Sequence, residues 1–257
     1  MNPSDSSPAT RPVVLIGGIT GGIGSDVARR LAAAGWQVGG FARQADRLAT
    51  LATELPGLFT READATDTAQ VEATVEAARA HFGRIDAYVH AVGSILLKPA
   101  HLTKTEEWAR TLDLNLNSAF YALRAVLGPM QAQGGGSIIF VSSAAAAVGL
   151  PNHEAIAAAK GGLNGLVLAA AATYAPRNIR VNAVAPGLVD TPLAAGMLGS
   201  DAARALSEKM HPLGRVGRPV NIGSLIAWLA SAEADWVTGQ IWSVDGGMAH
   251  VRSKPKI

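Results

Sequence analysis

Hydrophobic and polar positions along the chain form two kinds of segment that alternate. Short apolar runs rich in Val and Ile are separated by longer, Ala-rich stretches with the spacing of amphipathic helices. This alternation is typical of βαβ units and a parallel sheet. We expect seven strands, near 13–17, 37–42, 58–63, 85–90, 137–142, 180–184 and 240–244. Helices are expected near 22–34, 46–55, 68–82, 105–131, 152–174 and 220–230.

The predicted fold class is α/β: a Rossmann-type, doubly wound, seven-stranded parallel sheet with helices on both faces, in three layers. No shift in composition divides the chain, so 13–257 is expected to form one domain after a disordered N-terminus at 1–12. Residues 188–212 interrupt the alternation with only weak helical patterning. Long connections in compact domains usually have a function, and we expect this one to be a substrate lid.

Composition narrows the possible partners. The net charge is +2, and the basic tail at 252–256 is too short for a nucleic-acid-binding surface. No apolar stretch reaches the roughly 18 residues of a membrane span. The chain has no cysteine, which excludes disulfides, thiolate nucleophiles and cysteine-bound metals. We expect a cytoplasmic protein that binds neither nucleic acid nor a membrane.

A glycine-rich turn, GGITGGIG at 17–24, joins the first predicted strand to the first predicted helix. Glycines there allow a tight turn, close approach of the backbone to a pyrophosphate, and presentation of free N–H groups at the helix N-terminus. An ordinary flexible turn is the alternative. The position between a strand and a helix favours a dinucleotide site.

The spacing of Gly18, Gly22 and Gly24 resembles the TGxxxGIG motif of the short-chain dehydrogenase/reductase family, with Gly17 in place of the threonine. The resemblance covers about residues 13–248. HAVG at 90–93 stands where the family has NNAG, PGLVDT at 186–191 resembles PGxxxT, and VDGG at 244–247 resembles the C-terminal pattern. That C-terminal pattern usually accompanies tetramers, so the resemblance implies a homotetramer.

The resemblance also implies a set of cofactor contacts. Asp64 matches the residue whose carboxylate receives the adenine amino group, although it could instead cap the next helix, for which Asp67 is better placed. Thr191 matches the threonine that holds the nicotinamide carboxamide. The full set is Gly18, Thr20, Gly22, Ile23, Gly24, Arg43, Asp64, Ala65, Ala91, Val92, Gly93, Lys160, Pro186, Gly187, Val189 and Thr191.

Arg43 favours NADP(H) over NAD(H). Members of the family that prefer NAD have an acidic residue at the end of the second strand, where this chain has Ala42 followed by Arg43. An acid would repel the 2′-phosphate, whereas an arginine can pair with it through charge-assisted hydrogen bonds. A solvated charge at a strand end is the alternative interpretation of Arg43, and NAD(H) remains the less favoured cofactor.

Three of the family's four catalytic positions have matches. Asn115 matches the helical asparagine, and Lys160 matches the lysine of the YxxxK motif. Ser143 matches the serine that orients the carbonyl, with Ser142 as its competitor at the same strand end. The family's tyrosine, which moves the proton, falls on Ile156, and isoleucine cannot move a proton.

Two replacements for the missing phenol are open. His153 shares a helical stripe with Ile156 and Lys160, and histidine is a competent acid near neutral pH. A first-turn position would keep His153 neutral, and a local hydrogen-bonding role is the alternative. A water held by Ser143, Lys160 and Asn115 could also serve. Since a general acid contributes about 10²- to 10⁴-fold, its loss need not abolish hydride transfer.

Two functions follow from this pattern. The first is an NADP(H)-dependent oxidoreductase with a nonstandard proton donor, acting on a small hydrophobic carbonyl or alcohol compound. The apolar residues 194–198 of the predicted lid favour such a substrate. The second is a non-catalytic NADP(H)-binding subunit or sensor, for example in a hetero-oligomer with an active homologue. A lyase or dehalogenase on the same fold fits less well, because such relatives tend to lose the glycine turn and keep the tyrosine.

Overall fold

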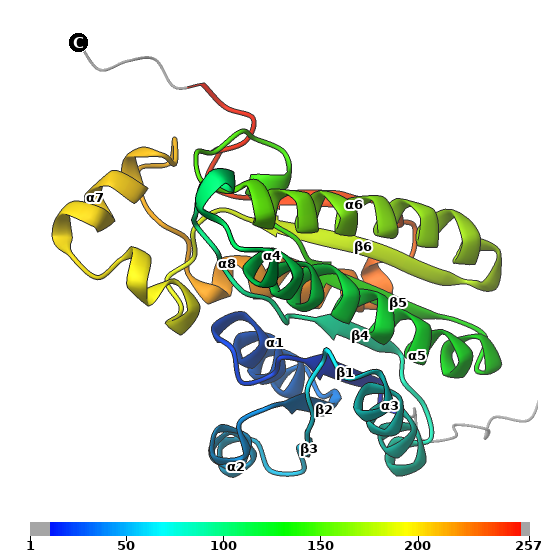
Figure 1. The fold of residues 1–257 in the computed structure, drawn as a ribbon. Helices are drawn as coiled ribbons and strands as arrows, with labels where there is room; N and C mark the ends of the chain where they lie inside the picture. Colours follow the sequence, from blue (N-terminus) through cyan, green and yellow to red (C-terminus); the bar gives the residue numbers. More distant parts are fainter. Residues whose placement is uncertain (1–10, 253–257) are drawn as a thin grey trace, which may run out of the picture.

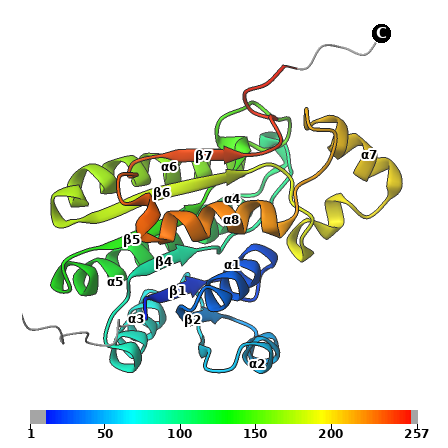
Figure 2. The same ribbon diagram turned by 180° about the vertical axis from the view of Figure 1, so that it is seen from behind.

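The computed structural model describes residues 11–252, which form a parallel sheet between two layers of helices (Figures 1 and 2). The strands are β1 (Val13–Gly17), β2 (Gln37–Ala42), β3 (Phe59–Glu62), β4 (Ala87–His90), β5 (Gly136–Val141), β6 (Ile179–Pro186) and β7 (Ile241–Val244). The helices are α1 (Gly22–Ala33), α2 (Ala45–Glu54), α3 (Thr68–Phe82), α4 (Thr105–Leu112), α5 (Ser118–Ala132), α6 (Glu154–Tyr174), α7 (Asp201–Lys209) and α8 (Pro219–Ala230).

The sheet order is β3-β2-β1-β4-β5-β6-β7, and every neighbouring pair is parallel. The predicted Rossmann-type fold class is therefore confirmed. The chain order reverses between β1 and β4, which are adjacent in the sheet. In open α/β sheets a crevice forms at this point, outside the carboxyl ends of the strands.

Successive residues of a strand point to opposite faces, so each strand feeds two cores. In β1, Leu15 packs into the core beneath α3, α5 and α6, whereas Val14 and Ile16 pack into the core beneath α1, α2 and α8. All three side chains are fully buried. Burial on both faces explains why the strands are near-continuous apolar runs.

The predicted helix at 105–131 is wrong in one respect, because a π-helical segment, Asp113–Asn117, separates α4 from α5. Such segments are frequent at functional sites. The segment contains Asn115, whose side-chain amide donates to the carbonyl of Thr111 four residues earlier (2.9 Å). The segment contains no glycine or proline, so the sequence does not mark the break.

The predicted lid at 188–212 contains a 3-10 helix, Pro192–Met197, and helix α7. Helix α7 extends from the carboxyl edge of the sheet at the side of the molecule (Figure 1). None of its residues is buried. Its start is fixed by Ser200, whose hydroxyl accepts from the N–H of Ala203 (3.2 Å).

Other boundaries differ by one or two residues at strand and helix ends. The prediction that the first helix ends at Gly35 is confirmed to within a residue. Gly35 follows α1 with a φ of 86°, a left-handed conformation that glycine tolerates. The predicted disordered N-terminus and the basic tail lie largely outside the described residues. Contrary to the expectation from the sequence, the segment 154–177 is long and apolar enough to cross a membrane; 44% of its apolar window is buried in this fold, where Leu163 and Val167 pack into the core.

Candidate functional site

Two pockets lie side by side at the carboxyl edge of the sheet. The first, the glycine-turn pocket, has a volume of about 350 Å³ and is lined by segments that follow β1, β2, β3 and β4. The second, the Lys160 pocket, has a volume of about 140 Å³ and is lined by segments that follow β4, β5 and β6, together with α6. Both include Ile23, 91–93, Thr191 and Leu193, so they form one continuous cleft.

The glycine turn has the geometry of an anion-binding helix start. Gly18 has a φ of 75°, and a Cβ there would lie 2.8 Å from the carbonyl oxygen of Ala91. A Cβ on Gly24 would overlap the carbonyl oxygen of Gly18. Gly21 precedes α1 in an extended conformation and caps it with no side chain, so N–H groups of the first turn remain available to a ligand. The turn therefore fits a pyrophosphate.

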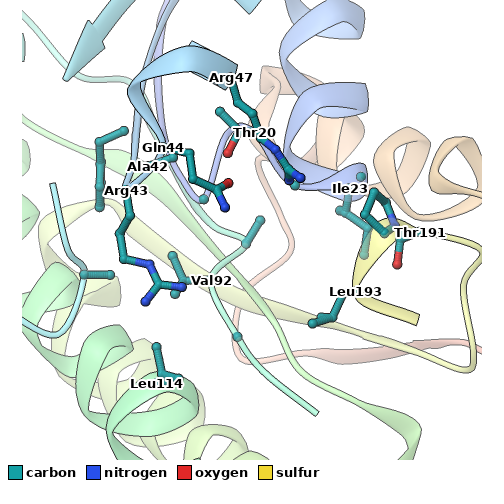
Figure 3. A pocket seen from close by; sticks show the side chains of 18 of the residues that line it. Thr20, Ile23, Ala42, Arg43, Gln44, Arg47, Val92, Leu114, Thr191 and Leu193 are labelled. Atoms are coloured by element: carbon teal, nitrogen blue, oxygen red, sulfur yellow. The ribbon is translucent and has the colours of Figure 1, made fainter. Parts of the chain in front are cut away.

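The other end of the glycine-turn pocket is basic. Arg43, Gln44 and Arg47 come from the junction of β2 and α2, and their side chains extend over the pocket (Figure 3). Arg43 Nη1 lies 4.0 Å from Asp64 Oδ2, and its side chain is 57% exposed. A dinucleotide phosphate group could reach it without displacing a strong pair.

Arg47 is a candidate that sequence reasoning missed. It lies in the first turn of α2, where the positive end of the helix dipole makes a cation unfavourable. A basic residue in that position, four residues after Arg43, was the available signal. The structure puts both arginines on the lining of the same pocket.

Asp64 lies at the end of β3 and is held by Thr66, whose N–H and hydroxyl donate to Oδ1 at 2.9 and 2.8 Å. Partial burial raises the pKa of Asp64, but the Thr66 hydrogen bonds and the charge of Arg43 outweigh it and lower the pKa overall. The carboxylate is thus an available acceptor. Helix α3 is capped by Asp67 instead, which accepts from Gln70 N (3.1 Å), as the sequence indicates.

Of the sixteen predicted cofactor residues, all except Gly24 line one of the two pockets. Gly24 instead lacks a Cβ where the carbonyl oxygen of Gly18 packs against it. The structure thus brings the predicted set together in a single cleft, and contact with a cofactor stays a prediction for each member.

Lys160 lies at the base of its pocket, on α6. It is 5% exposed, and Nζ donates to the carbonyl oxygen of Val141 (2.8 Å). Burial lowers the pKa of Lys160 to about 8, because an apolar environment disfavours the ammonium form. Ile156 lies one turn earlier on the same helix and lines the same pocket.

Asn115 and Ser143 also line the Lys160 pocket. Asn115 Oδ1 accepts from Ser94 N (3.1 Å), and Nδ2 donates to Ser94 Oγ (3.0 Å). Ser143 Oγ accepts from Ala145 N (3.1 Å), which leaves its O–H free to donate into the pocket. Its competitor Ser142 is buried and bonded to Asn164 Oδ1 (2.6 Å), so the structure favours Ser143.

His153 is not where the helical stripe predicts it. It is the N-cap of α6, with φ −107° and ψ 12°, so it lies outside the regular helix and does not line the Lys160 pocket. Its Nδ1 is 2.7 Å from the carbonyl oxygen of Pro151. The prediction that His153 faces the cleft is therefore wrong, and the alternative of local hydrogen bonding is the one that the structure supports.

His90, whose role the sequence left open, belongs to a buried chain of hydrogen bonds. Ser118 donates its proton to Leu114 O (2.9 Å), so His90 Nε2–H must donate to Ser118 Oγ (3.0 Å). The other ring nitrogen, Nδ1, then accepts from the hydroxyl of Tyr88 (2.9 Å). Burial and the charge of Lys160 lower the pKa of His90 to about 3, consistent with this neutral ring.

The fold and the cleft together define a dinucleotide-binding protein of the Rossmann class. A family model described as enoyl-(acyl carrier protein) reductase matches residues 18–249. The chain is 40% identical over 244 residues to cis-4-hydroxycyclohexanecarboxylate dehydrogenase of Sinomonas cyclohexanicum, covering 93% of this chain and 97% of that protein. The chain belongs to the short-chain dehydrogenase/reductase family of oxidoreductases.

Solved structures agree. A short-chain type dehydrogenase/reductase from Mycobacterium ulcerans superposes with a TM-score of 0.89 at 32% identity, covering 93% of this chain and 90% of that one. A single-site variant of actinorhodin polyketide ketoreductase, solved with NADPH, gives a TM-score of 0.90 at 29% identity, covering 94% and 98%. NADPH is thus bound by a close structural neighbour.

Proposed function

We propose that this protein is an NADP(H)-dependent oxidoreductase that interconverts a carbonyl compound and an alcohol, with a proton donor other than tyrosine. The observation that carries the proposal is the arrangement of Ser143, Lys160 and Asn115 around a pocket continuous with the glycine-turn pocket. By its spacing from Lys160, which matches the YxxxK motif, Ile156 is proposed to take the place of the family's tyrosine.

NADP(H) is the proposed cofactor because two arginines, Arg43 and Arg47, line the pocket end beyond β2. A 2′-phosphate carries charge that guanidinium groups pair with strongly. When bound, the cofactor supplies or accepts a hydride. Thr191 and Lys160 are proposed to hold the nicotinamide end of the cofactor. Thr191 lines both pockets, and Lys160 lines the pocket named after it.

The proposed substrate is an uncharged alicyclic ketone or alcohol. The wall of the Lys160 pocket is largely apolar, and its aliphatic members include Ile95, Ile156, Leu188, Leu193 and Ala194. Among the described residues no arginine lines this pocket, and Lys160 is its one cation. A relative named for a hydroxycyclohexanecarboxylate supports a ring-shaped substrate, whereas the lining of this pocket favours a ring without the carboxylate.

The lid over 188–212 is proposed to cover this substrate. Leu188, Leu193 and Ala194 from its first half line the Lys160 pocket, and Arg204 of α7 pairs with Asp190 at 2.8 Å. The two halves are joined by this exposed ion pair and by a hydrogen bond from the N–H of Leu188 to Nε2 of the buried His211 (3.1 Å).

A homotetramer is the proposed assembly. Large apolar side chains are exposed on neighbouring helices, among them Trp108 on α4, Phe120 on α5 and Leu168 on α6. Trp236, which is 97% exposed, lies just before β7. Exposed apolar residues at these places would be covered in an assembly. Light scattering should give the mass of four copies of the 26.4 kDa chain.

Cofactor binding followed by turnover tests the proposed function. We expect NADPH to quench tryptophan fluorescence with a lower Kd than NADH, and NADPH to be consumed with cyclohexanone or a larger neutral ring ketone. A charged ketone such as 4-oxocyclohexanecarboxylate should react more slowly. No turnover across neutral ring ketones at high enzyme concentration, with NADPH bound, would contradict the proposal.

The second candidate function is a non-catalytic NADP(H)-binding subunit or sensor, alone or in a hetero-oligomer with an active homologue. Ile156 in the lining of the Lys160 pocket favours this second function, because an isoleucine side chain has no ionisable proton to transfer. If this candidate is correct, the protein binds NADPH and is silent, and Ile156→Tyr switches on reductase activity.

A further inference from the structure

We infer that Lys160 itself is the proton donor of the reduction, and the proton acceptor of the reverse reaction. This inference rests on the proposed function and goes beyond it, since it assigns the missing acid to one atom, Lys160 Nζ. In relatives with a tyrosine at this site, the lysine acts through the phenol. Here Ile156 occupies that place, and Lys160 remains next to it in the same pocket.

Elimination gives the first argument. Within the described chain, Lys160 is the one residue with a titratable side chain that lines its pocket. His153 lies outside the pocket, with Nδ1 against Pro151 O. His90 is 1% exposed, and both of its ring nitrogens are engaged. The hydroxyl of Tyr88 donates to His90, and burial raises the pKa of this tyrosine.

The position of Nζ gives the second argument. Only one of its three N–H groups is used, in the bond to Val141 O. Nζ also lies 3.6 Å from the point that a Cβ on Gly93 would occupy, so it faces the segment at 91–93 that both pockets share. The remaining N–H groups are available to a substrate oxygen, or to one water between them. Ser143, with its free O–H, can hold the same oxygen.

The electrostatic surroundings suit an acid that works near neutral pH. No carboxylate lines the pocket among the described residues, so no ion pair stabilises the ammonium form. On β4, the facing titratable group is His90, which is neutral. On β5 the contact is a backbone carbonyl, and on the π-helical segment it is the amide of Asn115. Burial lowers the pKa of Lys160 to about 8, close to the optimum for proton transfer at physiological pH.

The step balances without a further reagent. The hydride supplied by NADPH carries two electrons to the carbonyl carbon, and the C=O π pair moves to oxygen. One N–H bond of the Lys160 ammonium breaks as the O–H bond of the alcohol forms, directly or through the water. The amine that remains takes a proton from solvent, which restores the ammonium. In the oxidation direction, neutral Lys160 accepts the alcohol proton.

A pH profile in both directions is the first test. For reduction we expect kcat to be level below about pH 7 and to fall tenfold per pH unit above about 8, as the ammonium is lost. Oxidation should rise through the same pH range. The pKa should also appear without turnover, in an NMR titration of the Lys160 ε-carbon assigned by Lys160→Arg.

Substitution with amine rescue is the second test. Lys160→Arg keeps the positive charge but cannot release a proton in this range, so reduction measured at saturating NADPH should fall about 10²- to 10⁴-fold. Because arginine is larger, Lys160→Ala is the companion variant: added methylamine or ethylamine should restore reduction, with a rate that follows the amine's pKa. Lys98→Arg, which alters a lysine paired with Glu107 outside the pocket, is the control.

The outcomes separate the two claims. Wild-type protein that binds NADPH and reduces nothing contradicts the proposed function, and the role of Lys160 with it. Wild-type protein that reduces a ketone with a flat profile from pH 6 to 10, or whose Lys160→Arg variant keeps its rate, leaves the function intact and overturns the assignment of the donor.

Discussion

His90 Nε2 donates to Ser118 Oγ at 3.0 Å, and this bond joins the end of β4 to the first residue of α5. Ser118 lies three residues after Asn115, just beyond the π-helical segment. On the other side of the ring, Tyr88 places its hydroxyl next to Gly17, where a Cβ would lie 2.7 Å from the oxygen. A buried polar chain thus runs from the base of the glycine turn to the helix that carries Asn115.

Breaking this chain should cost stability. In Ser118→Ala the N–H of His90 loses its acceptor inside the core, and a buried unpaired donor costs about 1–3 kcal/mol. Urea unfolding should show that loss. Ser224→Ala is the control, because Ser224 is exposed and bonds only to its own helix; we expect a change below about 0.5 kcal/mol. Equal losses in the two variants would contradict the buried chain.

Arg43 and Arg47 should determine cofactor preference. Each charge-assisted hydrogen bond to the 2′-phosphate contributes about 1.5–3 kcal/mol, so Arg43→Ala or Arg47→Ala should raise the Kd for NADPH at least tenfold. The Kd for NADH should stay within about twofold. Calorimetry with both cofactors measures this, with Arg79→Ala as a control on an arginine paired with Glu76 in α3. If NADPH and NADH weaken equally, the arginines do not recognise the phosphate.

Gly93 should tolerate no side chain. A Cβ there would lie 2.8 Å from Asn115 Oδ1, so alanine must displace the amide that Ser94 holds. A shift of about 1 Å in an active site can cost about 10²-fold in rate, and we expect a loss of that order in kcat for Gly93→Ala. Gly161→Ala, at a helical glycine with open space around its Cα, should keep kcat and gain up to about 1 kcal/mol. A kcat unchanged in Gly93→Ala would remove Asn115 from the site.

Lys160 should destabilise the fold at neutral pH. The drop in its pKa from 10.5 to about 8 corresponds to about 3 kcal/mol. The unfolded chain holds a proton between pH 8 and 10.5 that the folded protein has released, so wild-type stability should rise with pH in that range. Lys160→Met should be more stable than wild type at pH 7, with a flatter dependence above pH 8. Denaturant unfolding at pH 7 and 9.5 checks both; a less stable variant would show that the charge is well solvated.

The sequence predicted the sheet well because both of its faces are buried, which makes the strands continuous apolar runs. The choice of Ser143 over Ser142 stays a prediction, and the bond between Ser142 and Asn164 supports it. Helix α7, which buries no residue, and the π-helical segment, which contains no glycine or proline, were both missed.

His153 was misplaced because a helical stripe assumes helical geometry, and an N-cap residue does not have it. The bonding of His90 depends on Tyr88 and Ser118, which are two and 28 residues away, so no local pattern shows it. Arg47 was visible only as a cation in an unfavourable first turn. For His90 and Arg47 the missing information was tertiary contact, which spacing along the chain does not carry, and for His153 it was the exact start of the helix.

Transfer of deuterium tests the central claim most directly. The protein is incubated with NADPH deuterated at both C4 positions and a neutral ring ketone, and the alcohol is analysed by mass spectrometry. We predict one deuterium on the carbinol carbon of the product, with its yield falling above about pH 8. NADPH that binds to the protein while the ketone remains unlabelled and unreduced would contradict the claim.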